Sequence, residues 1–114
     1  MNHPDILLFM SDQHAPQFMG GAEIPVDTPN LDVLRREGTS FNETYTACPL
    51  CVPARMAMLS GIRPSHTGIF TNVDTLPDTQ PTFLHHLAAA GYETVLVGRM
   101  HFIGQDQRHG FTKR

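Results

Sequence analysis

Two short apolar runs constrain the fold of this chain more than any other feature. Residues 5–10 (Asp-Ile-Leu-Leu-Phe-Met) and residues 94–97 (Thr-Val-Leu-Val) lack polar alternation, and turn-forming residues bound each run. Runs of this kind are typical of strands that are buried on both faces of a parallel sheet. We therefore expect a central strand at each position.

The segments between these runs carry start and stop signals for helices. Thr28 precedes Pro29 and Gly38 follows Glu37, which predicts a helix over 29–37 with Thr28 as its N-cap. A second helix is predicted from Pro53 to a stop at Gly61, with proline in the first turn. A third is predicted from Thr82 to Gly91, with an apolar face.

The remaining segments complete the fold prediction. Residues 39–46 are rich in Thr, Phe and Tyr and suit a short strand or extended segment, whereas residues 62–80 are dense in Pro, Thr, Gly and Asp and suit a loop. Helices that alternate with apolar strands predict an α/β fold, with a largely parallel sheet flanked by helices. A length of 114 residues allows one domain at most.

Composition excludes several classes of function. The chain is 40% apolar and 17% charged, with a net charge of −3 and no basic stripe, so nucleic acid is not an expected partner. No basic segment precedes the short apolar run, so neither a signal peptide nor a membrane span is expected, and the expected location is the cytoplasm. Cys48 and Cys51 are too close to staple a fold and too few for a zinc site.

Three polar clusters are expected at one edge of the predicted sheet. Residues 11–14 follow the first predicted strand and residues 98–101 follow the second, while Cys51 precedes the second predicted helix. Open α/β sheets bind ligands beyond the carboxyl ends of their strands. A helix start beside that edge favours an anionic group, because its amide groups and dipole are positive there.

Residues 51–64 (Cys-Val-Pro-Ala-Arg-Met-Ala-Met-Leu-Ser-Gly-Ile-Arg-Pro) resemble the signature of formylglycine-dependent sulfatases, which reads Cys-x-Pro-Ser/Ala-Arg and continues with Leu-Thr/Ser-Gly-x-x-Pro. The resemblance implies that a formylglycine-generating enzyme oxidises Cys51 to an aldehyde. Its hydrated form attacks the sulfur of a sulfate ester and later expels sulfate. Arg55, one helical turn away, is expected to stabilise the nucleophile with a permanent positive charge.

The other two clusters extend the resemblance. Asp12-Gln13 is similar to the family's metal-binding strand end, in the Asp-Gln form of choline-sulfatase-like members and phosphonate monoester hydrolases. This implies that Asp12, Gln13 and the modified Cys51 bind a divalent cation, with Ca²⁺ expected and Mn²⁺ or Mg²⁺ as alternatives. Gly-Arg-Met-His at 98–101 resembles the family's Gly-Lys-x-His segment, so Arg99 and His101 are expected to contact the sulfate and the leaving group.

Together these motifs imply that residues 1–114 form the N-terminal part of an alkaline-phosphatase-like sulfatase domain. The implied function is hydrolysis of a small-molecule sulfate ester, with little turnover expected of this chain alone. A phosphonate monoester or phosphodiester hydrolase is the alternative within the same superfamily. A non-catalytic truncated remnant is the alternative outside catalysis.

Simpler interpretations of the same residues remain open. Cys48-Pro49-Leu50-Cys51 also fits a redox Cys-x-x-Cys pair, in which a helix start lowers a thiol pKa. Asp12 also fits a helix cap or a loop carboxylate, and Arg99 with His101 also fits a solvated loop pair. His85 and His86 are expected to be surface or capping groups on the third helix.

Overall fold

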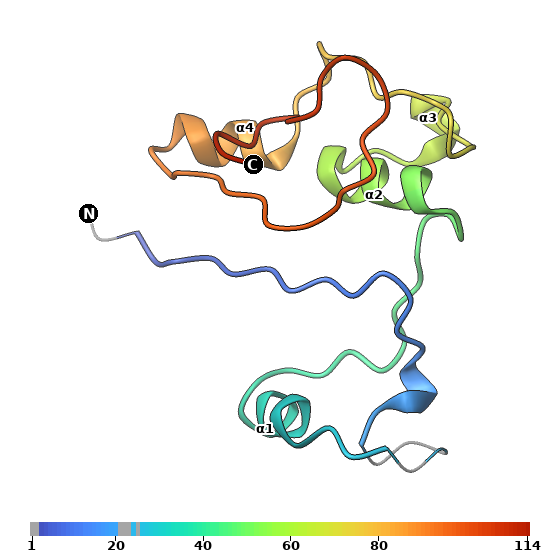
Figure 1. Ribbon diagram of the computed structural model, residues 1–114, viewed down its shortest axis with the longest axis vertical. Coiled ribbons are helices and arrows are strands. Elements are labelled where there is room, and N and C mark those ends of the chain that lie inside the picture. The colour runs from blue at the N-terminus through green and yellow to red at the C-terminus, as the bar shows by residue number, and fades with distance from the viewer. Residues whose placement is uncertain (1–2, 21–23, 25) are drawn as a thin grey trace. The chain divides into compact units, whose positions relative to one another are not determined.

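The computed structural model describes residues 3–20, 24 and 26–114. The chain divides into two compact units, residues 1–44 and residues 45–114. The first unit contains the 3₁₀ helix η1 (Pro16–Phe18) and helix α1 (Pro29–Glu37) (Figure 1). The second contains the remaining helices and the hydrophobic core.

Helix α1 confirms the prediction for residues 29–37. Pro29 occupies its first position, and the amide of Gly38 closes it by donating to the Leu34 carbonyl at 2.9 Å. Thr28 is the N-cap residue, yet its side chain makes no capping bond to the helix. Its Oγ1 instead accepts a hydrogen bond from the Gly20 amide at 2.8 Å, which ties the preceding loop to the start of α1.

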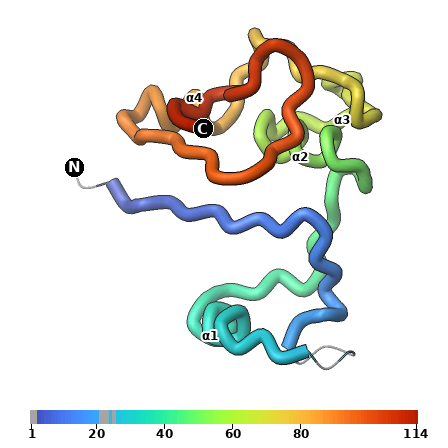
Figure 2. The backbone as a smooth tube through the Cα atoms, viewed as in Figure 1, coloured from blue at the N-terminus to red at the C-terminus, as the bar shows by residue number. Residues whose placement is uncertain are grey.

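The prediction of a strand at residues 5–10 is wrong. In the part of the chain that the structure describes, these residues run as an extended segment without strand pairing (Figure 2). The side chains of Leu7 and Phe9 are 78% and 85% exposed. A strand needs a neighbour to pair its backbone donors and acceptors, and an apolar pattern does not show whether that neighbour is present.

The helices of the second unit are α2 (Cys51–Ser60), α3 (Pro64–Thr67) and α4 (Phe83–Ala89). Helix α2 begins at Cys51, two residues before the predicted start at Pro53, and ends at Gly61 with a left-handed φ of 71° as predicted. Helix α3 occupies part of the predicted loop at 62–80. None of the helices that the structure describes has the length and apolarity needed to cross a bilayer.

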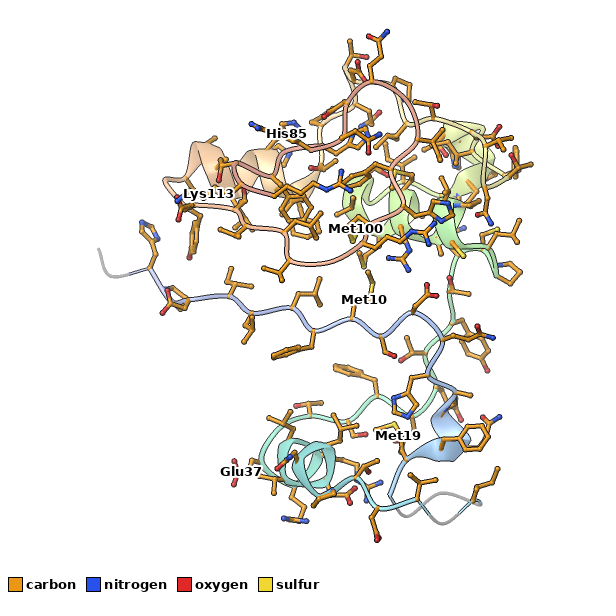
Figure 3. The ribbon with its side chains drawn as sticks, viewed as in Figure 1. Met10, Met19, Glu37, His85, Met100 and Lys113 are labelled. Atoms are coloured by element: carbon orange, nitrogen blue, oxygen red, sulfur yellow. The ribbon has the colours of Figure 1, made fainter. Side chains whose placement is uncertain are left out.

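Helix α4 begins after Thr82, as predicted, and its first turn is capped by a histidine. The Nδ1 atom of His85 accepts a hydrogen bond from the Thr82 amide at 3.0 Å. A side chain at this position reaches back to the cap residue in a capping box. His85, labelled in Figure 3, therefore has the capping role that the sequence predicted.

The hydrophobic core lies within the second unit, where one face of α2 packs against α4 and the segment after residue 98. Met100 from that segment is labelled in Figure 3. The buried apolar residues of this core are Val52, Met56, Leu59, Ile69, Leu76, Leu84, Met100 and Phe102. Residues 52, 56 and 59 follow helical spacing, so a single stripe of α2 supplies much of the core.

The second predicted strand, residues 94–97, forms a single parallel bridge between Val95 and Lys113. Beside this bridge, the hydroxyl groups of Thr94 and Thr112 bind backbone carbonyls of the facing segment. Thr94 Oγ1 donates to the Gly110 carbonyl at 2.7 Å, and Thr112 Oγ1 donates to the Thr94 carbonyl at 2.8 Å. Val97 is 92% exposed, which is incompatible with a central strand.

The predicted α/β fold with a largely parallel sheet is therefore wrong for this structure. Residues 3–20, 24 and 26–114 contain helices, loops and one isolated bridge, and residues 39–46 form no strand. The physical reason is shared by the two predicted strands and by residues 39–46, for which a short strand or an extended segment was expected. Their sequences favour extended backbone, but pairing depends on partners that are distant in the chain.

Gly110 provides a test of the packing between the C-terminal segment and α4. Its φ is +100°, and an added Cβ would lie 2.9 Å from both the His85 amide nitrogen and Leu84 Cβ. We expect Gly110→Ala to lower the free energy of unfolding by about 2–4 kcal/mol, because backbone strain and overpacking add. Urea unfolding monitored by circular dichroism measures the change.

Gly91→Ala is the matched control. Gly91 has a similar φ of +93°, with no atom within 4 Å of the added Cβ. It should lose only the conformational part, about 1–2 kcal/mol. Equal losses in the two variants would contradict the packing of Gly110 against α4.

Candidate active site

Cys51 is the first residue of α2, and its side chain is exposed. The chain enters the helix through Leu50, whose φ of −114° and ψ of 149° are extended. Cys48 is half-buried, and both thiols are free. This placement leaves Cys51 accessible for modification at the positive end of a ten-residue helix.

The amide groups at the start of α2 are already engaged. The Val52 amide donates to Asn72 Oδ1 at 3.0 Å, and the Ala54 amide donates to the Leu50 carbonyl at 3.0 Å. Pro53, between them, has no amide hydrogen. The amides of residues 52 and 54 are therefore committed within the protein, and side chains must supply much of the charge stabilisation at this helix start.

Asn72 is a site residue that the sequence analysis missed. It lies in the loop after α3, which Asp74 closes by accepting hydrogen bonds at Oδ2 from the Phe70 amide (2.8 Å) and the Thr71 amide (2.7 Å). These two bonds lower the pKa of the Asp74 carboxyl below its usual value of 3.8. An Asn two residues before an Asp in a loop suggests a side chain bound to backbone, but the sequence gives no sign that its partner is Val52.

Arg55 joins α2 to the polar cluster at residues 98–101. Its side chain is only 9% exposed, and Nη1 donates to the Arg99 carbonyl at 2.9 Å. The donor is a guanidinium, so this bond is charge-assisted and strong. The structure thus brings together Arg55 and the Arg99 backbone within the second unit, whereas the predicted sheet edge on which three clusters would meet is not formed by the described residues.

The segment that carries Arg99 and His101 has an unusual backbone. Gly98 has a φ of +108° and His101 a φ of +57°, in the left-handed region that histidine seldom adopts. The Arg99 side chain is exposed, and His101 is half-buried. Between them, Met100 is buried in the core, so the two polar residues flank an apolar anchor.

Asp12 and Gln13 belong to the first unit, where they form a bend after the extended segment and are exposed. Their oxygen atoms suit a hard cation, which takes about six or more oxygen ligands. Among residues 3–20, 24 and 26–114, no group of three or more His, Cys, Asp or Glu side chains is arranged to hold a metal. The residues present do not complete a metal site, so no chemical step is assigned to a metal here.

Comparison with known proteins identifies the family to which this chain is similar. A family model described as Sulfatase matches residues 4–114. The chain is 42% identical to a choline-sulfatase of Rhizobium meliloti (strain 1021), covering 97% of this chain and 22% of that protein. It is 34% identical to an N-acetylglucosamine-6-O-sulfatase of Bacteroides thetaiotaomicron, covering 91% of this chain and 19% of that protein.

An arylsulfatase of Clostridium perfringens (strain 13 / Type A) is 33% identical, covering 95% of this chain and 23% of that protein. The chain therefore spans about a fifth of the length of these relatives. The family model covers nearly the whole chain, from before the first polar cluster to Arg114. This chain belongs to the sulfatase family.

Proposed function

We propose that the protein carrying this chain hydrolyses sulfuric esters, with Cys51 converted to formylglycine as its nucleophile. The observation that carries the proposal is the bond from Arg55 to the Arg99 carbonyl. It places the signature arginine and the Arg99–His101 segment in one compact unit with Cys51. The names of the relatives, which are sulfatases, support the same reaction class.

The residues of α2 and those at positions 99 and 101 have distinct proposed roles. Formylglycine at position 51 would supply the oxygen that attacks sulfur and the oxygen that later expels sulfate. Arg55 would stabilise negative charge beside the nucleophile with its buried guanidinium. Arg99, where the family pattern has lysine, would contact the sulfate with a planar fork, and His101 would donate a proton to the leaving oxygen.

The partners follow from this proposal. A formylglycine-generating enzyme would act on Cys51, and a small-molecule sulfate ester would be the substrate. Asp12 and Gln13 would contribute oxygen ligands to a divalent cation, with Ca²⁺ expected from the hardness of these donors. The similarity to a choline-sulfatase makes choline sulfate the first substrate to test.

The proposed function predicts that Cys51 is converted to formylglycine. When the longest natural form of the protein is produced with a formylglycine-generating enzyme, the peptide that contains Cys51 should lose about 18 Da, the difference between a thiol and an aldehyde side chain. Peptide mass spectrometry measures this. The same preparation should hydrolyse choline sulfate or an aryl sulfate.

Cys51→Ala is the control for both measurements, and it should show neither the mass change nor turnover. A fully converted protein that cleaves phosphonate monoesters or phosphodiesters in preference to sulfate esters would favour the alternative hydrolase. An unmodified Cys51 under these conditions would contradict the proposed nucleophile.

The proposed function also predicts that Asn72 positions the first turn of α2. Asn72→Ala removes the acceptor of the Val52 amide, so the first turn of α2 should loosen and displace residue 51. We expect kcat to fall about tenfold in the converted enzyme, because small displacements of a nucleophile are costly. Steady-state kinetics, normalised to the converted fraction from mass spectrometry, measures the effect.

Asn72→Asp separates positioning from charge. The carboxylate keeps an acceptor for the Val52 amide, so kcat should stay near that of the unchanged enzyme while KM rises through repulsion of the anionic substrate. Thr67→Ala is a matched control, since it removes a side-chain bond in the same region that serves the Ile69 amide. A kcat for Asn72→Ala equal to that of Thr67→Ala would contradict the role of Asn72.

A further inference from the structure

His109 is a titratable side chain enclosed in the second unit and not used by the proposed chemistry. Its side chain is 1% exposed, and neither ring nitrogen has a hydrogen-bond partner among the described residues. Buried polar atoms are nearly always hydrogen-bonded, so this ring is exceptional. Placing a positive charge on it there would be costly.

Backbone bonds on both sides hold the ring in place. The His109 carbonyl accepts a hydrogen bond from Thr82 Oγ1 at 2.7 Å, at the start of α4. The His109 amide donates to Asp106 Oδ1 at 3.0 Å. With a φ of +43°, the residue adopts a left-handed conformation that these bonds stabilise. The hydrogen bonds of the His109 backbone therefore fix the position of the residue, while its ring is held by packing.

The ring packs against the aromatic residue that follows His101. The Phe102 and His109 rings meet edge to face, with 4.8 Å between their centroids. Phe102 is buried in the core beside Met100. The segment from residue 98 to residue 111 runs from α2 back to α4 (Figure 2). Near its end, the His109 ring supports Phe102.

Several charged groups face this ring. Asp106 Oδ2 lies 3.4 Å from His109 Nδ1. Asp78, in the loop before α4, and His85, on α4, also act on the charge of the imidazole. The Arg114 guanidinium lies 5.7 Å from the centroid of the neighbouring Phe102 ring. Burial lowers the pKa of His109 below its ordinary value of 6.5 and outweighs the two carboxylates, which raise it. His85 adds to the lowering.

We propose that His109 is a pH-sensitive latch, which holds the segment carrying Arg99 and His101 against the core only while its imidazole is neutral. Protonation would place a positive charge in a site that is nearly closed to water, and the ion pair with Asp106 at 3.4 Å would offset that cost only in part, so the ring would leave and the support of Phe102 would be lost. The effect on catalysis rests on the function proposed above. The latch itself does not.

The direction of the pH effect follows from linkage. A histidine whose pKa is lower in the folded state binds more protons when unfolded. The stability it contributes is complete above its unfolded pKa of 6.5, and it is lost as the pH falls through the lower folded-state pKa. Asp74 and Asp106 also have lowered pKa values, but their ordinary value is 3.8, so their contributions are lost in a separate, more acidic range.

The test uses the unchanged protein first. We expect the His109 ring, followed by NMR of its carbon and nitrogen resonances, to titrate below 6.5. Hydrogen exchange of the amides at 98–111 should accelerate about tenfold beyond the intrinsic pH effect between about pH 7.5 and about pH 5. A His109 ring that titrates at or above 6.5, or exchange that shows no acceleration in this range, would overturn the proposal.

A pair of variants then assigns the effect to this residue. His109→Asn tolerates a left-handed φ and cannot be protonated, so the acceleration below neutral pH should disappear. His86→Gln removes an exposed histidine of α4 and should leave the acceleration unchanged. If His109→Asn retains the acceleration, the latch is assigned wrongly. Since exchange is measured without substrate, this outcome is distinct from a failure to hydrolyse sulfate esters.

Discussion

The second unit depends on one interaction, the hydrogen bond from the buried guanidinium of Arg55 to the Arg99 carbonyl. It links the helix that begins at Cys51 to a loop residue far along the chain, Arg99, through a charged donor with little access to water. Losing this partner would leave a buried cation without one of its acceptors, which is far more costly than losing a surface contact. A single side chain therefore couples the integrity of the core to the arrangement of the candidate active site.

The sequence predicted helices well because their signals are local. Pro29 with Gly38 marked α1, and Thr82 marked the start of α4. The predicted strands failed because a strand is defined by pairing with residues elsewhere in the chain. The threonines at 94 and 112 illustrate the point, since their hydroxyl groups form a compact clasp in place of a ladder. Nothing in an apolar run predicts that outcome.

The sequence predicted the local setting of the signature in part, while the roles of its residues stay predictions. The signature put Cys51 beside a helix start and led to Arg55, and the structure adds an acceptor for Arg55, the Arg99 carbonyl. The role of Asn72 could not be predicted from the sequence, because a side chain that binds an amide twenty residues away produces no periodic pattern. The expectation that free helix amides would face an anion also needs revision, since the Val52 amide is bound to Asn72. The proposed metal ligands Asp12 and Gln13 stay a prediction.

The exposed run at residues 6–10 has a consequence for biosynthesis. A ribosome releases these residues before any of the core residues, all of which follow residue 51. Until those core residues emerge, the nascent chain presents an extended, apolar segment at residues 6–10, which is the kind of segment that associates with other chains. Early binding by a chaperone at this segment would therefore protect this part of the protein until the core residues of the second unit have emerged.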